Sequence, residues 1–416
     1  MKIGLISQWF PPEHGSAALP GVIAQALADA GHDVSVVTGF PNYPDGDLQS
    51  GWRQRWRYSE QRSGALVHRT PLYVSHDHRS WRRMLNYASF AVSATVTSLR
   101  ELRSVDVAWV HATPALPALA AMALRRVAGV PYVLHIQDLW PDTVVASGML
   151  PKTLEPLARG PLEWFCRRSY ARAAAVAIIA PGMRDVLIQR GVQDNKIVDI
   201  PNWADESIFK PTELAPGERA RLGLPPGFVA MYAGAMGDVQ GLETIIRAAE
   251  LVQDDESIHL ALVGDGVARP RLEATVKERG LTNVTFVEPQ PLSSMSRVMS
   301  SADVQIICLK DLPLYRITLP SKVQATLAAG RPILVSAGGD ASSVVSRAHA
   351  GISVEPGDEF EMAKALRRMA NASESERSAW GERGRQYYAD NFSQGVGVSR
   401  MVHAMEQACC GSQVTT

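Results

Sequence analysis

The chain has 416 residues, with 42 basic and 42 acidic side chains and a formal net charge of zero at pH 7. One hydrophobic core seldom supports that length, so we expect two domains of about 200 residues each. Because the charges balance, the basic footprint of a nucleic-acid-binding protein is missing, and we expect no nucleic acid as a partner.

The cysteines and the apolar segments indicate a cytoplasmic protein. Four cysteines, with Cys409 and Cys410 adjacent, match neither paired metal-ligand spacing nor a secreted disulfide framework. The apolar run at residues 2–7 is too short for a signal peptide, and no window reaches the about 20 apolar residues that span a bilayer. We therefore expect neither a signal peptide nor a membrane-spanning helix.

The first half of the chain alternates short apolar strands with helical segments. A strand, a loop, a helix and a second strand follow one another in residues 2–38, and later runs are apolar on both faces, as in parallel strands covered by helices. The predicted strands are residues 2–7, 33–38, 106–112, 131–138 and 175–180. Residues 1–200 are therefore expected to form a doubly wound, Rossmann-like α/β domain.

The second half repeats this alternation after a break. "DIPNWADESIFKP" is rich in turn residues and proline, which predicts an interdomain linker at residues 201–211. Residues 212–390 then predict a second Rossmann-like α/β domain, and residues 391–416 a helix and tail that pack back on the first domain. Ligands of such sheets bind at the carboxyl ends of the strands, so we expect a cleft between the two domains.

The first strand is not followed by a dinucleotide-binding motif. G-x-G-x-x-G needs three glycines in fixed spacing, and only Gly15 and Gly21 fall in this region. We therefore do not expect a nicotinamide-dependent dehydrogenase. Gly15 is either an ordinary turn glycine or a position where a ligand approaches the backbone closely.

A glycine-rich loop follows the first strand of the second domain. "YAGAMGDVQG" places Gly234, Gly237 and Gly241 between a strand and a helix. Backbone amides in such loops can hold an oxyanion without a charged side chain. The loop predicts an anion site, although the motif is weak by itself.

Two more helix starts in the same domain favour an anion. Ser321 and Lys322 begin an alanine-rich helix, with Arg316 just upstream. A lysine in the first turn, where the helix dipole is already positive, is either solvated or placed there for a docked anion. A third start carries Gly339 and Asp340. Together these starts predict a nucleotide diphosphate as ligand, and no acidic pair is spaced to hold a divalent metal.

Polar residues also follow a buried strand of the first domain. "HIQDLWPDT" places His135 within the strand and Asp138 and Asp142 just past it. We favour a hydrogen-bonded core histidine for His135. Asp138 either caps the next segment or accepts hydrogen bonds from substrate hydroxyl groups, and we favour the second role.

These stretches together resemble retaining glycosyltransferases of family 4, which have two Rossmann-like domains in the GT-B architecture. The resemblance covers nearly the whole chain and is strongest to the bacterial branch that makes O-antigen, capsule and colanic acid, including fucosyl and N-acetylfucosaminyl transferases. The stretches that carry it are "LISQWFPPEHG", "GHDVSVVTGFPNYPDG", "HIQDLWPDTVVASGML", "IPNWAD", "YAGAMGDVQGLETII", "LVGDG" and "LPSKVQATLAAGRPIL".

The resemblance implies where the substrates bind. A nucleotide-sugar donor, UDP-linked or alternatively GDP-linked, would lie mainly on the second domain. Its base would lie near Pro289 and Gln290, and its ribose and diphosphate against residues 234–241 and the Lys322 helix. The first domain would bind the acceptor, and Gly15 would approach the diphosphate or the transferred sugar. No cofactor and no metal are expected.

The chain departs from the family pattern at four positions. Many relatives have an arginine and a lysine in the glycine loop, where this chain has Ala235 and Gln240. Many also have two glutamates eight positions apart, where this chain has Ile317 and Ala325. The usual contact with the ribose is therefore lost.

The remaining basic residues of the donor site are expected to take over the catalytic role. Arg316 and Lys322 would neutralise the nucleoside diphosphate as it leaves, since its charge grows while the glycosidic bond breaks. Asp138 completes the predicted catalytic set on the acceptor side.

The acceptor is predicted from an arginine- and aromatic-rich stretch. Relatives commonly act on lipid-diphosphate-linked sugars, so we favour a polyprenyl-diphosphate-linked acceptor and a peripheral contact with anionic membrane. A solvated face and a soluble acceptor, such as an antibiotic aglycone, are the alternatives. The residues of this stretch are Trp52, Arg53, Arg55, Trp56, Arg57, Arg62, Arg69, Arg79, Trp81, Arg82, Arg83 and Tyr87, against Glu60 and Asp77.

Two other functions remain open at this point. A nucleotide-sugar 2-epimerase of the same architecture would need acid and base groups at the sugar ring and no acceptor. A non-catalytic subunit that binds sugar nucleotides is the other alternative, because both glutamates are missing.

Overall fold

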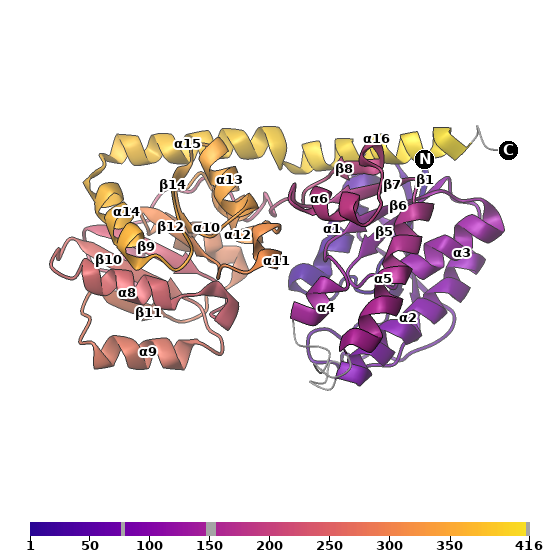
Figure 1. Cartoon of the computed structure of the whole chain (residues 1–416), viewed down its shortest axis with the longest axis horizontal. Helices are drawn as coiled ribbons and strands as arrows, with labels where there is room; N and C mark the ends of the chain where they lie inside the picture. Colours follow the sequence, from indigo (N-terminus) through magenta and orange to yellow (C-terminus); the bar gives the residue numbers. More distant parts are fainter. Residues whose placement is uncertain (76–79, 147–154, 413–416) are drawn as a thin grey trace. The chain divides into compact units, whose positions relative to one another are not determined.

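The computed structural model describes residues 1–75, 80–146 and 155–412 (Figure 1). The chain divides into two compact units, Met1–Pro201 with Val398–Thr416, and Asn202–Gly397. Each unit is built on one mainly parallel sheet with helices on its faces. The predicted α/β class with two Rossmann-like doubly wound sheets is confirmed.

The first unit has an eight-stranded sheet in the order β3-β4-β2-β1-β5-β6-β7-β8. Its pairs are parallel except for the antiparallel hairpin of β3 and β4 at one edge. The strands are β1 (Lys2–Ile6), β2 (Asp33–Gly39), β3 (Tyr58–Arg62), β4 (Ala65–Thr70), β5 (Val107–Ala112), β6 (Tyr132–Ile136), β7 (Ala175–Ile178) and β8 (Ile197–Asp199). The buried central strands explain the continuous apolar runs in the sequence.

The β3–β4 hairpin corrects the prediction of one continuous basic surface. Arg69 is buried, and its guanidinium donates to Glu60 Oε1 (2.7 Å) and to the carbonyl of Gly39 (2.9 Å). The ring of Trp52 lies 4.5 Å below this guanidinium, and Tyr87 is also buried. Because Arg69 and Tyr87 are buried, neither side chain is available to a membrane. Asp77 and Arg79 of the same stretch lie outside the described residues.

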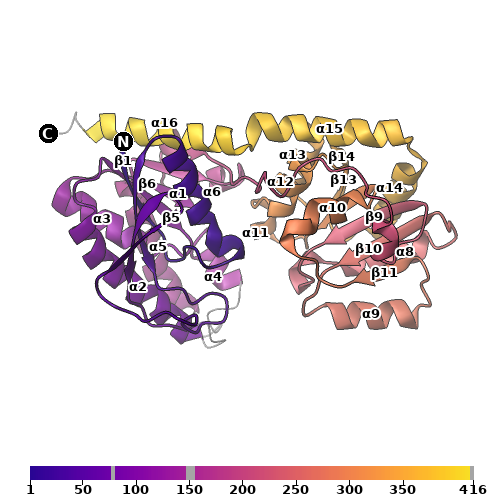
Figure 2. The ribbon, with the colours of Figure 1, turned by 180° about the vertical axis from the view of Figure 1, so that it is seen from behind.

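The helices of the first unit cover both faces of its sheet. They are α1 (Leu19–Asp29), α2 (Ser80–Glu101), α3 (Ala118–Ala128), α4 (Asp142–Ala146), α5 (Glu155–Arg172) and α6 (Met183–Gln189). Helix α3 packs between α2 and α5, and these three form one layer, whereas α1 lies on the opposite face (Figures 1 and 2). Right-handed crossovers produce this division, because α1 connects β1 to β2 in one direction across the sheet, whereas α2 connects β4 to β5 in the opposite direction.

The second unit has a six-stranded parallel sheet in the order β11-β10-β9-β12-β13-β14. The strands are β9 (Phe228–Ala233), β10 (Ile258–Val263), β11 (Val284–Val287), β12 (Val304–Cys308), β13 (Ile333–Ser336) and β14 (Gly351–Val354). The strand order reverses between β9 and β12. The carboxyl ends of these two strands therefore flank the point where open α/β sheets bind ligands.

Helices α8 and α14 pack together over a buried cluster that includes Tyr232 and Cys308. The helices of this unit are α7 (Glu218–Arg221), α8 (Glu243–Leu251), α9 (Arg269–Glu278), α10 (Met295–Ser300), α11 (Pro313–Arg316), α12 (Ser321–Ala328), α13 (Asp340–Arg347), α14 (Glu359–Asn371) and α15 (Glu374–Asn391). Helix α16 (Gln394–Ser412) begins here, and its residues from Val398 onward group with the first unit. None of the helices in the described parts of the chain is long and apolar enough to cross a membrane.

Candidate functional site

Lys322 occupies the second position of α12 and reaches back over β9. Its Nζ lies 3.6 Å from the ring centroid of Tyr232, the penultimate residue of β9. The ammonium is shielded from solvent and has no hydrogen-bond acceptor among the described residues. A buried cation that lacks an acceptor is rare, so Lys322 is a candidate contact for an anionic ligand.

Burial lowers the pKa of Lys322 to about 7, because an ammonium that loses its water is less stable in the charged form. The face of the Tyr232 ring attracts the cation and offsets part of that loss. Nearby, burial raises the pKa of the Cys308 thiol to about 12, so this cysteine stays neutral. Among the described residues, no carboxylate accepts a hydrogen bond from the Lys322 ammonium.

Gly234 makes room for this lysine. A Cβ at this position would lie 2.6 Å from Lys322 Cε and 2.7 Å from Nζ, and the backbone has φ +137°. The residue that follows β10 also packs closely against the loop, since a Cβ at Gly264 would lie 2.2 Å from the carbonyl oxygen of Gly234. Only glycine combines this backbone conformation with this close approach.

The glycine loop itself differs from the amide cradle that the sequence predicted. The amide of Gly234 donates to the carbonyl of Val263 (2.9 Å), and that of Gly237 donates to Oε1 of Gln240 (2.9 Å). These two amides already have acceptors, so they are not free to hold an oxyanion. Gln240 closes the loop on itself, and Gly241, with φ +61°, turns the chain toward α8. The Gly237 amide becomes available to an anion only if the Gln240 side chain rotates away from it.

Arg316 and Gly339, which the sequence places in one predicted site, are in contact in the structure. A Cβ at Gly339 would lie 1.8 Å from the carbonyl oxygen of Arg316, so the loop before α13 packs directly on α11. The guanidinium is already engaged, since it donates to both carboxylate oxygens of Asp311 at 2.6 and 2.8 Å. Among the predicted basic residues, Lys322 thus carries the charge without an acidic partner. Asp311 was not anticipated from the sequence.

The other predicted donor residues surround the same sheet edge. Ser321 is exposed and opens α12, and Asp340 is nearly buried at the start of α13. Gln290 accepts from Arg221 (3.2 Å) and donates to the carbonyl of Glu288 (2.9 Å), with Pro289 exposed beside it.

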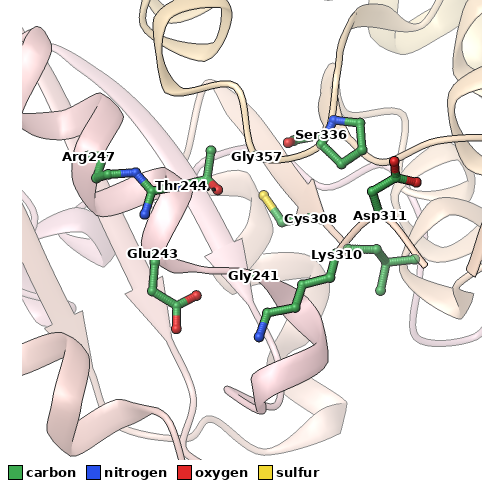
Figure 3. Close-up of a pocket in the computed structure, with 11 residues that line it drawn as sticks. Gly241, Glu243, Thr244, Arg247, Cys308, Lys310, Asp311, Ser336 and Gly357 are labelled. Carbon is green, nitrogen blue, oxygen red and sulfur yellow. Dashed lines mark hydrogen bonds between the residues drawn. The ribbon is translucent and has the colours of Figure 1, made fainter. Parts of the chain in front are cut away.

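A cavity of about 320 Å³ opens at the carboxyl ends of β12 and β13 (Figure 3). Its walls are Gly241, Glu243, Thr244, Arg247, Cys308, Leu309, Lys310, Asp311, Ser336, Pro356 and Gly357. Both carboxylates of the lining are paired, Glu243 with Arg271 and Asp311 with Arg316. Lys310 has no ion pair within the described residues. This lysine was not anticipated from the sequence, although its place just after a buried strand was a usable signal.

Asp138 follows β6 in the first unit, and burial raises the pKa of its carboxyl group to about 6. The neighbouring polar residues are structural. His135 is buried and bonds through Nε2 to the carbonyl of Ile200 (3.0 Å), as a core histidine would. Asp142 is ion-paired with Arg190. Gly15, with φ +65°, opens a 3-10 turn, and a Cβ at this position would meet no heavy atom within 4 Å.

A row of aromatic rings, which was not anticipated from the sequence, lies at this sheet edge. Trp9 lies 5.5 Å from Tyr43 and 6.4 Å from Tyr87, and Tyr87 lies 5.7 Å from Trp140, between ring centroids. Trp9, Tyr43 and Trp140 each follow a parallel strand within four residues of its end. Trp140 is two residues after Asp138, so the row and the carboxyl group lie at the same edge.

The part of the chain that the structure describes holds no group of three or more histidine, cysteine, aspartate or glutamate side chains that could bind a metal ion.

The two mainly parallel, Rossmann-like sheets match the architecture of the GT-B class of glycosyltransferases. Residues 15–203 match the family described as a glycosyl transferase 4-like domain, and residues 227–372 match glycosyl transferases group 1. WcaI of Escherichia coli (strain K12), named as a colanic acid biosynthesis glycosyl transferase, is 30% identical over 342 residues, 81% of this chain and 83% of that protein. The chain therefore belongs to the family 4-like glycosyltransferases of GT-B architecture and is a glycosyltransferase.

Two further similarities concern other activities and the fold. The 2-deoxystreptamine glucosyltransferase of Streptomyces kanamyceticus is 26% identical over 382 residues, 89% of this chain and 93% of that protein. HepE of Anabaena, solved in complex with UDP-glucose, has a TM-score of 0.67 at 16% identity, over 98% of this chain and 99% of that one. At that identity the second similarity shows the fold.

Proposed function

We propose that this glycosyltransferase moves a sugar from a nucleoside-diphosphate donor to an acceptor hydroxyl with retention of configuration and without a metal ion. UDP is the favoured nucleotide and GDP the alternative. The acceptor is a lipid-linked, polyprenyl-diphosphate type, and the product belongs to a bacterial surface polysaccharide. The name of WcaI supports that pathway, and the UDP-glucose complex of HepE supports the nucleotide.

The unpartnered ammonium of Lys322 carries this proposal. When the glycosidic bond breaks, the diphosphate gains negative charge, and a cation held in place beforehand stabilises that charge without reorganising. The backbone amides at the start of α12 would add to this stabilisation, since an eight-residue helix presents the positive end of its dipole there. Lys322 thus fulfils the role that the missing basic residues at positions 235 and 240 have in many relatives.

Arg316 and Lys310 are the supporting cations of the proposed donor site. Arg316 is held by Asp311, so it would contribute only after exchanging this carboxylate for phosphate oxygens. Lys310 is exposed and borders the cavity beside Gly241, where a Cβ would lie 3.3 Å from its Cγ. We therefore expect a smaller catalytic contribution from each of them than from Lys322.

Asp138 and the aromatic row form the proposed acceptor side. A carboxylate accepts hydrogen bonds from sugar hydroxyls, and aromatic faces suit the apolar face of a sugar ring. The raised pKa of Asp138 keeps its carboxyl group ready to take a proton near neutral pH.

The test uses the purified chain with a panel of nucleotide sugars and a bacterial membrane extract as the source of acceptor. Lys322→Ala should lower turnover by about ten- to a thousandfold, the range of one oxyanion contact, and Arg316→Ala by less. Lys364→Ala is the matched control, because this exposed lysine of the same unit forms an ion pair with Glu361 at the surface. Parent-like kinetics in Lys322→Ala would contradict the proposal. Solvent deuterium in donor incubated without acceptor would instead indicate an epimerase.

A further inference from the structure

The solvent side of α2 is apolar. Trp81, Leu85, Val92 and Val96 are 59%, 43%, 61% and 51% exposed. At about 100° per residue these four side chains fall within roughly 60° of arc, opposite the buried Phe90. A surface helix normally turns its charged residues to solvent, so this arrangement is reversed.

The same helix lacks charge over most of its length. Residues 84–99 include no acidic or basic side chain, whereas Arg82 and Arg83 precede them and Arg100 follows. Contiguous exposed apolar surface on a protein of this kind marks a site where something else binds.

The apolar surface continues onto the neighbouring helices. On α5, Leu157 and Trp164 are 77% and 66% exposed, and on α3 Val127 is exposed as well. Helix α3 packs between α2 and α5, so these side chains project from one layer of the first unit (Figure 1). The loop that carries the exposed Trp56 borders this layer, since Arg100 donates to the carbonyl of Trp56 (3.4 Å).

The layer is strongly basic, although the whole chain is neutral. Helices α2, α3 and α5 hold nine arginines and three glutamates, while the complete chain has 42 basic and 42 acidic residues. Some of this charge is paired, as Glu163 is with Arg167 (2.9 Å). Arg126 and Arg168 have no ion pair within the described residues.

We propose that the outer face of α2, α3 and α5, called here the basic apolar face, docks onto an anionic lipid surface. A bilayer interface offers acyl chains for tryptophan, leucine and valine and anionic headgroups for arginine, so it complements both properties at once. A second copy of this chain would match the apolar residues but would bring two basic layers together. Charge therefore favours lipid over self-association.

This inference extends the proposed function, because a lipid-linked acceptor lies at such a surface, but it does not rest on the donor chemistry. It also changes the surface expected from the sequence, because Arg69 and Tyr87 of that stretch are buried. Residues 81–83 of that stretch belong to α2 and so to the basic apolar face, and the loop of residues 53–57 borders it.

Co-sedimentation with vesicles tests the proposal. The parent should bind phosphatidylglycerol vesicles, bind phosphatidylcholine vesicles poorly, and be released by 0.5 M salt as headgroup attraction is screened, at about 3–5 Å Debye length. The variant Trp81→Gln/Leu85→Gln/Val92→Gln/Val96→Gln should partition at least about tenfold less, because four exposed side chains lose their transfer to acyl chains. UDP-glucose binding should be unchanged in it.

A matched control removes apolar residues elsewhere. Val267→Gln/Leu292→Gln/Phe360→Gln changes three exposed side chains of the second unit and should bind vesicles like the parent. As a second measurement, brominated phosphatidylglycerol should quench part of the tryptophan fluorescence, and Trp81→Phe should remove part of that quenching. Equal partitioning of the α2 variant and the parent would overturn the proposal. So would a dimeric parent that becomes monomeric in the α2 variant.

Discussion

The ammonium of Lys322 lies 3.6 Å from the ring centroid of Tyr232, the penultimate residue of β9, just before the glycine loop. The aromatic ring packs against the ammonium, and the hydroxyl of Tyr232 donates a hydrogen bond to the carbonyl of Ala235 (2.5 Å). The lysine is therefore in place before any ligand arrives, at a cost in stability that a bound diphosphate would offset.

Removal of the charge should stabilise the protein. Lys322→Met keeps most of the side-chain volume and suits the aromatic ring, so the free energy of unfolding at pH 7 should rise by about 1–3 kcal/mol. The pKa of Lys322 falls from 10.5 to about 7 on folding, so the unfolded chain binds more protons between these values. The contribution of Lys322 to stability should therefore improve as pH rises from 7 toward 10.5.

Urea unfolding of the parent and Lys322→Met at pH 7 and pH 9.5 measures this effect. The difference between the two proteins should shrink at the higher pH. The control Lys364→Met, at an exposed site, should change little at either pH. A less stable Lys322→Met at pH 7 would show that the ammonium is well compensated in the free protein.

Binding of UDP-glucose should depend on pH through the same lysine. The charged form binds the diphosphate, and in the free protein it declines as pH rises through about 7. Affinity should therefore fall by about tenfold between pH 7 and pH 8.5. Calorimetry in buffers of different ionisation enthalpy should show proton uptake on binding. In Lys322→Arg the guanidinium stays charged, so the affinity for UDP-glucose should not change with pH. An equally steep pH dependence in this variant would assign the titration to another group.

Gly234→Ala should weaken both stability and UDP-glucose binding. The new Cβ would meet the Lys322 side chain at 2.6 Å, and φ of +137° strains any L-residue. Because the lysine is flexible, it would move aside, and its ammonium would leave the site. Calorimetry should show a loss of affinity of about tenfold or more, as for one misplaced charged contact.

Two comparisons separate these effects. Gly395→Ala, where a Cβ meets nothing within 4 Å, should behave like the parent. In Gly234→Ala/Lys322→Ala the losses of affinity should be less than additive, because both changes remove the same contact. Full additivity would mean that Gly234 acts independently of the lysine.

Asp138→Asn should lower kcat/KM by about 10²–10³ through the loss of an ionisable acceptor group, with donor affinity preserved. In the parent, turnover should decline below about pH 6, where the carboxyl group becomes protonated. The asparagine variant should lack this acid limb. Steady-state rates from pH 5 to 8 measure it, and an unchanged limb in Asp138→Asn would remove this residue from the catalytic set.

The reaction should continue in excess chelator. The described residues contain no cluster of metal-binding side chains, and the cations of the proposed donor site would supply the charge that Mg²⁺ or Mn²⁺ supplies elsewhere. Turnover should stay within about twofold of the untreated rate, well inside the span of one lost catalytic contact. Activity that disappears with chelator and returns with Mg²⁺ would refute this expectation.

Local periodicity was enough to predict the two α/β sheets. Strands such as β5 and β10 are buried on both faces, so their apolar runs were visible directly in the sequence. Helix α12 and its lysine were predictable for a similar reason, because Ser321 follows Pro320 and Gly330 lies just beyond the last turn. The β3–β4 hairpin was not predictable, since β3 alternates half-buried and exposed residues and carries charge.

The sequence by itself determined the fold class, the family resemblance and the positions of Lys322 and Asp138 at strand or helix ends, because these depend on residues close together in the chain. Only the tertiary structure decided which charges are free. It paired Arg316 with Asp311, buried Arg69 beside Glu60, and left Lys322 over Tyr232 without an acceptor. Arg316 and Asp311 are five residues apart and Arg69 and Glu60 nine, but each pair forms only because the chain between the two residues folds back on itself. Lys322 meets Tyr232 from a distant part of the chain. No local pattern of residue types encodes these distances in space.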